Sequence, residues 1–218
     1  MIALFGGTFD PVHLGHLHAA ISVCEALDLD WISLLLSARP GHREIPGASV
    51  DDRFHMLQLA CQKDTRLVPD DREVRRARRL ARPSYTVETL EEIRGEKPGA
   101  AILWVIGSDA FEGLPGWYRW RELLDLTHLV VLGRPGDARE RPAALSVEVA
   151  RRQTVGRPVG EAGQIVFLNL PMLPISATEI RRTLAAGRSA ADLLPVAVST
   201  YIKDRHLYGV RSDPGSVA

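Results

Sequence analysis

Two histidines, His13 and His16, lie close to the start of the chain in the sequence GGTFDPVHLGH, residues 6–16. At a spacing of three they share one face of the opening turn of a helix, where two imidazoles can donate hydrogen bonds to one phosphoryl group. Gly15 keeps that face uncrowded. A pair at this spacing is also typical of half a metal site or of two surface histidines, so its surroundings decide the interpretation.

Those surroundings favour phosphate. Gly6 and Gly7 follow a short apolar run, Ile2 to Phe5, and the histidines open a segment of helical period. Two glycines let a ligand approach the backbone, and the N-terminus of a following helix offers free N–H groups and the positive end of its dipole. The segment fits neither the GxxxxGK[ST] nor the GxGxxG pattern. It predicts a phosphate-binding turn of another kind.

A second candidate segment is ISATEIR, residues 175–181. Ser176 and Glu179 have the spacing of a capping box, which predicts the start of a helix. A capped first turn leaves its N–H groups directed outward, and the nearby Thr178 and Arg181 could then hold phosphate oxygens. The structural and the functional interpretations are compatible.

The elements that must position these residues alternate along the chain. Apolar runs typical of buried strands alternate with segments of helical period. Strands are expected at 2–5, 31–36, 67–68, 101–106, 129–132 and 165–168, and helices at 17–27, 54–61, 87–93, 177–186 and 196–205. Strands separated by helices pair in parallel, which predicts an α/β fold with a doubly wound parallel sheet and ligands at the carboxyl ends of its strands. We expect one domain over residues 1–208 and a frayed tail over 209–218.

Composition excludes several classes of partner. Lys plus Arg and Asp plus Glu number 27 each, so no overall field draws the chain to nucleic acid or to an anionic membrane. No apolar run approaches the roughly 20 residues of a membrane helix, and the first residues resemble a strand more than a signal peptide. Cys24 and Cys61 suit buried free thiols, which predicts a cytoplasmic protein. The arginine-rich run 72–82 is expected to be a solvated loop, with a phosphate- or RNA-contacting patch as the alternative.

Several of these segments resemble one family. GGTFDPVHLGH is similar to the HxGH signature of the nucleotidyltransferase superfamily, and ISATEIR resembles its ISSTxxR motif, with Ala177 in place of a serine. Four more segments resemble bacterial nicotinate-nucleotide adenylyltransferases: RPSYTVETL (82–90), IGSD (106–109), LPGWYRW (114–120) and PVAVSTYI (195–202). The resemblance spans most of residues 1–208 and implies a Rossmann-like nucleotidyltransferase fold.

The resemblance implies transfer of the adenylyl group of ATP to nicotinate mononucleotide, without a covalent intermediate. Asp109 would bind the ribose of ATP, although a helix N-cap is its alternative role, and Trp117 would stack on the pyridine ring while Trp120 lies in the core. Mg²⁺ would be held mainly by the phosphates, because no carboxylate cluster is available. The catalytic residues would be His13, His16 and Arg181. ATP would contact Gly6, Gly7, Thr8, Phe9, His16, Gly107, Asp109, Ile175, Ser176, Thr178 and Arg181, and the acceptor would contact His42, Arg43, Thr86, Trp117 and Tyr118.

The chain departs from the family at residues 40–43, which read PGHR where PPHK is usual. Gly41 loosens this loop, while Arg43 keeps its positive charge. Two rival functions stay open. A phosphopantetheine adenylyltransferase shares both superfamily motifs but lacks the SYT and LPxWxxW segments. A non-catalytic nucleotide- or RNA-binding module is favoured only by the arginine run. The sequence does not indicate an oligomeric state.

Overall fold

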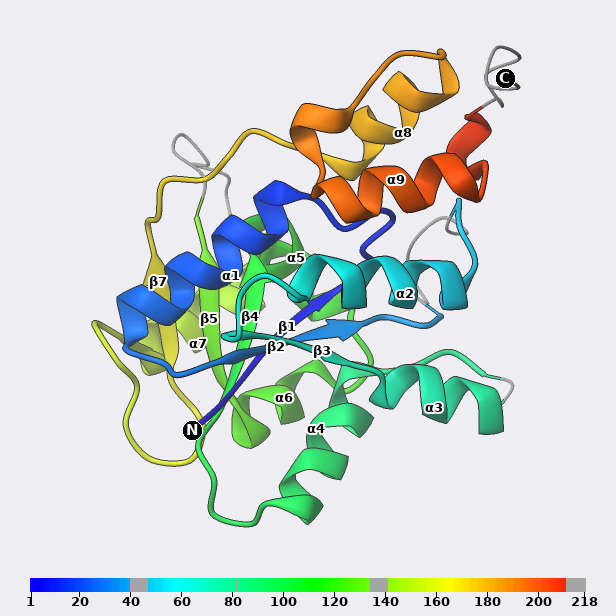
Figure 1. Cartoon of the computed structure of the whole chain (residues 1–218). Coiled ribbons are helices and arrows are strands. Elements are labelled where there is room, and N and C mark those ends of the chain that lie inside the picture. Colours follow the sequence, from blue (N-terminus) through cyan, green and yellow to red (C-terminus); the bar gives the residue numbers. More distant parts are fainter. Residues whose placement is uncertain (40–46, 81, 134–140, 211–218) are drawn as a thin grey trace, which may run out of the picture.

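The computed structural model describes residues 1–39, 47–80, 82–133 and 141–210. Within them, seven strands form one parallel sheet in the order β3-β2-β1-β4-β5-β7-β6 (Figure 1). The strands are β1 (Ile2–Gly7), β2 (Ile32–Leu36), β3 (Leu67–Asp70), β4 (Ile102–Gly107), β5 (His128–Leu132), β6 (Gln153–Thr154) and β7 (Ile165–Leu168). The predicted doubly wound parallel sheet is confirmed.

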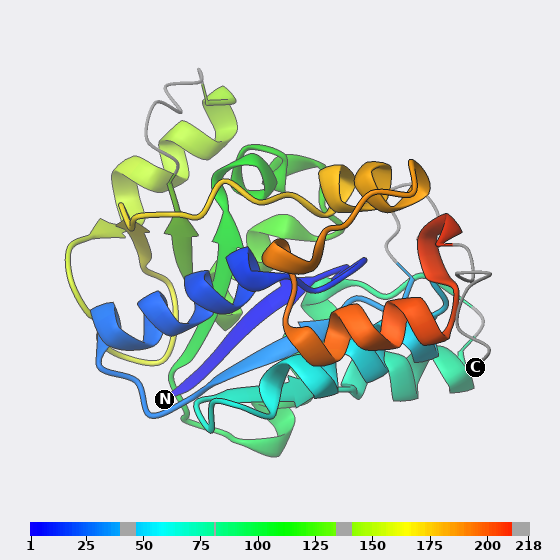
Figure 2. The same ribbon diagram turned by 45° about the horizontal axis from the view of Figure 1, so that its top comes forward.

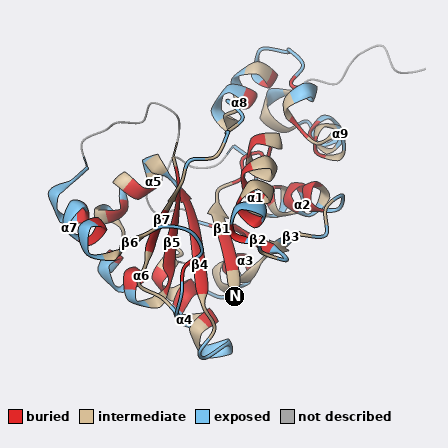
Figure 3. Ribbon diagram, turned by 90° about the vertical axis from the view of Figure 1, so that its left-hand side faces the viewer, coloured by how far each residue is buried: buried red, intermediate tan, exposed pale blue. Residues whose placement is uncertain are grey.

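Helices cover both faces of this sheet (Figure 3). One face packs mainly against α1, α2, α8 and α9, and the other packs against α4, α5, α6 and α7. Because both faces are buried, β1, β2, β4, β5 and β7 are largely apolar, which is why they appear in the sequence as continuous apolar runs. The helices are α1 (Leu14–Leu27), α2 (Val50–Cys61), α3 (Arg72–Arg79), α4 (Thr86–Glu96), α5 (Ser108–Glu112), α6 (Trp120–Leu126), α7 (Ala143–Arg152), α8 (Ala177–Ala185) and α9 (Val196–Asp204), with short 3₁₀ turns η1 (Leu114–Gly116), η2 (Ala191–Leu193) and η3 (Leu207–Gly209).

The strand order reverses at β1, which has β2 on one side and β4 on the other. In sheets of this kind a crevice opens outside the carboxyl ends of the strands at that point. The segment after β7 runs across this end of the sheet to α8, so α8 and α9 lie over the carboxyl end of β1 (Figures 1 and 2). The fold therefore brings the loop after β1 to the same place as α8 and α9, which are far from it in the sequence.

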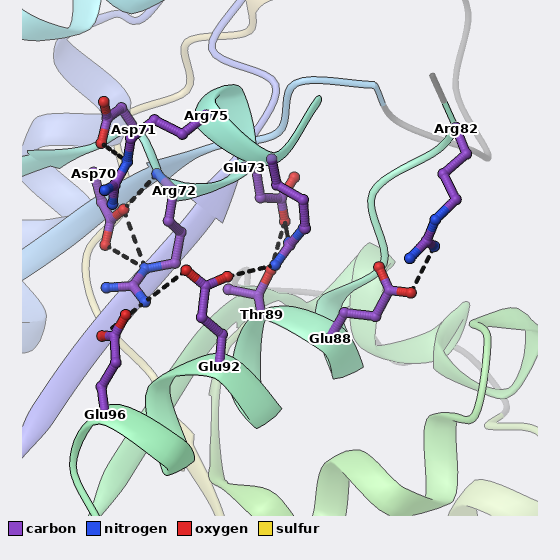
Figure 4. A network of polar contacts seen from close by, with 11 residues as sticks. Asp70, Asp71, Arg72, Glu73, Arg75, Arg82, Glu88, Thr89, Glu92 and Glu96 are labelled. Carbon is purple, nitrogen blue, oxygen red and sulfur yellow. Dashed lines mark hydrogen bonds and ion pairs between the residues drawn. The ribbon is translucent and has the colours of Figure 1, made fainter. Parts of the chain in front are cut away.

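The expected solvated loop at 72–82 is wrong, because residues 72–79 form α3. The side chain of Arg72 bonds the Asp70 carboxylate at 2.9 Å, and Arg76 bonds Glu92 on α4 at 2.8 Å (Figure 4). Both guanidinium groups are largely buried between the two helices. Glu73 is also buried, and burial raises the pKa of its carboxyl group. Much of the run is thus a helix–helix contact.

Two further expectations concern the thiols and membranes. Cys24 and Cys61 are free and buried as predicted, and burial raises the pKa of these thiols to about 11 and about 12. Across the described ranges, no helix is both long and apolar enough to span a bilayer.

Candidate active site

The end of β1 comes too close to aromatic side chains for any residue but glycine. A Cβ atom on Gly6 would lie 2.7 Å from the indole of Trp104, and one on Gly7 would lie 2.8 Å from the ring of Phe9. Contacts this short would force the aromatic rings to move. Because glycine has no side chain, a ligand can approach the main chain at both positions, as a phosphate-binding turn requires.

A buried arginine on α2 holds the loop that follows β1. One nitrogen of the Arg53 guanidinium, Nη1, donates to the carbonyl oxygens of Thr8 at 2.8 Å and Ser37 at 2.9 Å, and Nη2 donates to that of Ala38 at 3.1 Å. The side chain is wholly buried, and burial lowers the pKa of the guanidinium. Arg53 therefore ties the turn after β1 to the turn after β2. No motif in the sequence indicated this role of Arg53.

The two histidines stack on each other at the start of α1. His13 is the N-cap residue, and its ring centroid lies 3.7 Å from that of His16 with 27° between the planes. The backbone N–H of His13 donates to Nδ1 of His16 at 3.3 Å. Because Nδ1 accepts, the proton of a neutral His16 ring is on Nε2, which is then a donor. The predicted shared face of the two imidazoles is confirmed.

His13 is uncharged at neutral pH. Its side chain is only 4% exposed, and burial lowers its pKa to about 4. Nδ1 of His13 is buried and has no hydrogen-bond partner among the described residues. A buried polar atom without a partner is costly and is commonly retained where a ligand or a reaction uses the group.

Gly15 lies where the histidine turn meets the segment that leads into α8. A Cβ atom there would lie 3.0 Å from Nδ1 of His13 and 3.4 Å from the Cβ of Ile175. Ile175 therefore packs on the histidine turn, directly before α8. The hydroxyl of Ser176 accepts the N–H of Glu179 at 3.2 Å, which confirms the predicted cap of α8. The N-termini of α1 and α8 thus meet at one site.

Arg181 reaches from α8 into the loop after β1. Its Nη1 donates to the carbonyl oxygen of Asp10 at 2.8 Å and lies 3.7 Å from the Asp10 carboxylate. Its Nη2 is 3.5 Å from the hydroxyl of Thr178, and 30% of the side chain stays exposed. The two residues predicted to hold phosphate are therefore neighbours. Asp10, which sequence reasoning did not single out, is their link to the loop.

Gly107 and Asp109 lie at the end of the neighbouring strand. Phe5 of β1 pairs with Val105 of β4, so Gly7 and Gly107 end their strands at the same level. Gly107 is the N-cap of α5 and Asp109 the second residue of that helix, so the alternative of Asp109 as an N-cap is wrong. Its carboxylate remains a candidate for ribose hydroxyls.

Beside Asp109 lies a small hollow of about 60 Å³ at the ends of β4, β5 and β7. Arg141 lies 4.7 Å above the ring of Phe167 on its wall. Aromatic side chains with a few polar groups suit a flat, partly polar ring. The hollow is lined by Ser108, Phe111, Glu112, Val131, Gly133, Arg141 and Phe167.

The residues assigned to the acceptor come from α4 and from the turn before α6. The rings of Tyr85 and Tyr118 contact each other, with centroids 4.6 Å apart, which places Thr86, the first residue of α4, beside this turn. Trp117 is half-buried, whereas Trp120 belongs to the core as predicted. The other two acceptor residues, His42 and Arg43, lie outside the described residues.

Comparison with known proteins gives a consistent result. Residues 4–183 match the cytidylyltransferase-like family. The chain is 44% identical to a Pseudomonas syringae pv. tomato protein named "Probable nicotinate-nucleotide adenylyltransferase", over 99% of this chain and 96% of that one. It is 46% identical to a Pseudomonas aeruginosa protein of the same name, over 95% and 96%.

Solved structures agree on the fold. The nicotinic acid mononucleotide adenylyltransferase of Plasmodium falciparum, complexed with NaAD, superimposes with a TM-score of 0.74 at 16% identity, over 97% of this chain and 98% of that one. At this identity the likeness shows the fold alone, whereas the family model and the full-length relatives show the family. The chain therefore belongs to the cytidylyltransferase-like family and, within it, to the nicotinate-nucleotide adenylyltransferases.

Proposed function

We propose that this protein transfers the adenylyl group of ATP to nicotinate mononucleotide, forming nicotinate adenine dinucleotide and releasing pyrophosphate. One observation carries the proposal: two stacked imidazoles meet the capped N-terminus of α8 at the switch point of the sheet. Helix N-termini and neutral imidazole donors suit a phosphate chain. The names of the full-length relatives support the same reaction.

The reaction needs little covalent work from the protein. A phosphate oxygen of the acceptor forms a bond to the α-phosphorus of ATP, and the bond from that phosphorus to the bridging oxygen of the β-phosphate breaks. The electron pair leaves with pyrophosphate, in line with the attacking oxygen. Catalysis then consists of positioning two anions and stabilising charge that grows on the α-phosphoryl oxygens. His16, which offers Nε2–H, and the uncharged His13 are the groups assigned to those oxygens.

ATP would lie along the carboxyl ends of β1 and β4. The backbone of residues 6–9 would carry the α-phosphate, and Asp109 the ribose. The adenine would lie beside the hollow at the ends of β4, β5 and β7, where Arg141 and Phe167 lie. The leaving phosphates would meet the first turn of α8, with Ser176, Thr178 and Arg181.

The divalent cation is part of the nucleotide substrate in this proposal. Among the described residues, no group of three or more His, Cys, Asp or Glu side chains could hold a metal ion. The Asp10 carboxylate, the nearest buried acid, already accepts two N–H groups and one O–H group. Mg²⁺ would therefore arrive on the triphosphate, held by phosphate oxygens and water, where it neutralises the leaving group.

The acceptor would bind beside α4, with Trp117 stacked on its pyridine ring and backbone N–H groups near Thr86 and Tyr118 on its carboxylate. Two N–H groups that converge on a buried carboxylate form charge-assisted bonds. The amide of nicotinamide mononucleotide would have to turn its own NH₂ toward one of those donors, which leaves that donor unpaired. The acid should therefore be preferred by about 30- to 1,000-fold in kcat/KM. His42 and Arg43 are proposed to hold the acceptor phosphate.

The test is a pyrophosphate-release assay with MgATP and one acceptor at a time: nicotinate mononucleotide, nicotinamide mononucleotide or phosphopantetheine. The proposal expects release with the first at the stated preference. Equal use of the amide would overturn the choice of acceptor but leave adenylyl transfer standing. Release with phosphopantetheine alone would identify the rival enzyme. No release with any of them, combined with binding of RNA, would favour the non-catalytic module.

A further inference from the structure

Asp10 accepts hydrogen bonds from three separate parts of the chain. It lies in the loop between β1 and α1 and is buried. Oδ1 accepts the N–H of Ala48 at 3.1 Å and the hydroxyl of Tyr208 at 2.7 Å, and Oδ2 accepts the N–H of Gly47 at 2.7 Å. Arg181 contacts the same residue through its carbonyl oxygen. One residue thus connects the histidine loop to the segment before α2, to α8 and to the C-terminal turn.

The Tyr208 hydroxyl comes from a turn whose backbone is unusual. In η3, which follows α9, Tyr208 has a φ of +58°, and His206, the N-cap of this turn, has a φ of +51°. Residues other than glycine seldom adopt this left-handed conformation, and it persists only where contacts hold it. Burial and the neighbouring Asp10 raise the pKa of the Tyr208 phenol, so it keeps its proton and donates.

Tyr208, Gly47 and Arg181 are packed together. A Cβ atom on Gly47 would lie 3.2 Å from the Tyr208 ring and 3.4 Å from Cδ of Arg181. The Arg181 guanidinium is 3.7 Å from Oδ2 of Asp10, which is close but beyond a hydrogen bond. It bonds the Asp10 carbonyl oxygen instead, at 2.8 Å. The Asp10 carboxylate already accepts three hydrogen bonds, so its attraction for the Arg181 guanidinium is weaker.

We propose that Tyr208 is a positioning residue for the ATP site: its hydroxyl occupies the Asp10 carboxylate and so leaves Arg181 available to the triphosphate. This inference rests on the proposed function, which assigns Arg181 to the leaving phosphates. Without the hydroxyl, the buried carboxylate would lack one of its two shortest contacts. Tyr208 donates to Oδ1, and Arg181 faces the other oxygen, Oδ2, at 3.7 Å. Loss of the hydroxyl leaves more negative charge on the carboxylate that both oxygens share, and Arg181 needs to move by less than about 1 Å to bond Oδ2 directly.

The substitution Tyr208→Phe should therefore raise the KM for ATP by about 5- to 20-fold, and change the KM for the acceptor by less than twofold. A merely structural role would lower the melting temperature and leave the ratio of the two KM values unchanged. The chain supplies a matched control. On α9, the Tyr201 hydroxyl donates to Asp52 at 2.8 Å, so Tyr201→Phe removes a second tyrosine–aspartate bond away from Asp10. This control should leave both KM values within twofold.

A double-mutant cycle tests whether Tyr208 acts through Arg181. In an Arg181→Ala background, Tyr208→Phe should change the KM for ATP by less than threefold, because the group that it controls is absent. All variants are assayed as full chains at a temperature below their melting transitions, with MgATP and nicotinate mononucleotide.

Three results would overturn the inference: a rise in the KM for ATP below threefold in Tyr208→Phe, a rise of threefold or more in the Arg181→Ala background, or a Tyr208→Phe protein that does not fold. Each is distinct from failure of the proposed function, in which the unmodified protein itself would release no pyrophosphate.

Discussion

Gly15→Ala should separate catalysis from stability. Gly15 is the second residue of α1, and a Cβ atom there would lie 3.0 Å from Nδ1 and 3.1 Å from Cε1 of His13. The new methyl group would also contact Cβ of Ile175 at 3.4 Å, which limits how far it can move away from His13. The His13 ring must therefore shift by a few tenths of an ångström, and the ring of His16 stacked on it must follow.

The two consequences have different sizes. Alanine is favoured over glycine in a helix by about 1 kcal/mol, which offsets much of the cost of the tight contact, so the free energy of unfolding should change by less than about 1 kcal/mol. Catalysis is more sensitive, because a displacement of about 1 Å costs about 100-fold. A shift of a few tenths of an ångström in both imidazoles should lower kcat by about 10-fold.

The measurement is kcat from pyrophosphate release, paired with urea denaturation of the same variant. Gly95→Ala is the control, since Gly95 lies inside α4 and its added Cβ would meet no atom within 4 Å. That variant should gain about 1 kcal/mol of stability with unchanged kcat. A Gly15→Ala enzyme whose kcat stays within twofold of the unmodified protein would refute the claim that the histidine stack is tightly positioned.

Four further outcomes are expected. His16→Ala should lower kcat by about 100- to 1,000-fold with little change in ATP binding, and a loss below threefold would remove His16 from catalysis. Arg181→Ala should raise the KM for ATP and spare the acceptor; an effect on the acceptor alone would contradict its place at the triphosphate. Trp117→Ala should weaken the binding of nicotinate and nicotinamide mononucleotide equally, whereas the control Trp31→Ala, at an exposed tryptophan, should change neither. A changed ratio of kcat/KM for the acid and the amide would contradict simple stacking. Because the pKa of His13 is about 4 in the folded protein and 6.5 in the unfolded chain, the unfolded state binds the extra proton, so stability should fall by up to about 3 kcal/mol between pH 6.5 and pH 4. Urea titrations of His13→Gln should show that much less loss over this range, and parallel curves would contradict the buried, uncharged imidazole.

The described residues contain the six predicted strands and the five predicted helices, together with β6, α3, α5, α6 and α7, which were not predicted. All six predicted strands are present, because strands buried on both faces are continuous apolar runs. Helix α3 was missed since its eight residues, REVRRARR, include one buried apolar side chain, Val74. Ion pairs with α4 hold it in place, and those partners lie too far away in the sequence to be seen as a pattern.

In the site, residues in local motifs were predicted, and residues whose partners are distant in the sequence were not. Motif residues such as His16 and Ser176 were found because local spacing encodes a helix N-terminus. Arg53 and Asp10 were not, since their partners are main-chain groups distant in sequence, and Tyr208 was treated only as the end of the domain. A buried charge with backbone partners leaves no local pattern.

These buried charges explain how the phosphate loop is formed before a ligand arrives. Phe9 has a φ of +45°, a conformation that costs a non-glycine residue on the order of 1 kcal/mol or more. Nη1 of Arg53 keeps its bond to Thr8 only if the carbonyl of Thr8 points inward, and the Asp10 oxygens keep their donors only if the loop reaches Gly47 and Tyr208. Since an unpaired buried charge costs several kcal/mol, other loop conformations are disfavoured by more than the strain at Phe9. In the proposed function, ATP would then bind without ordering this loop, and the binding energy would remain for aligning the α-phosphate with the histidines.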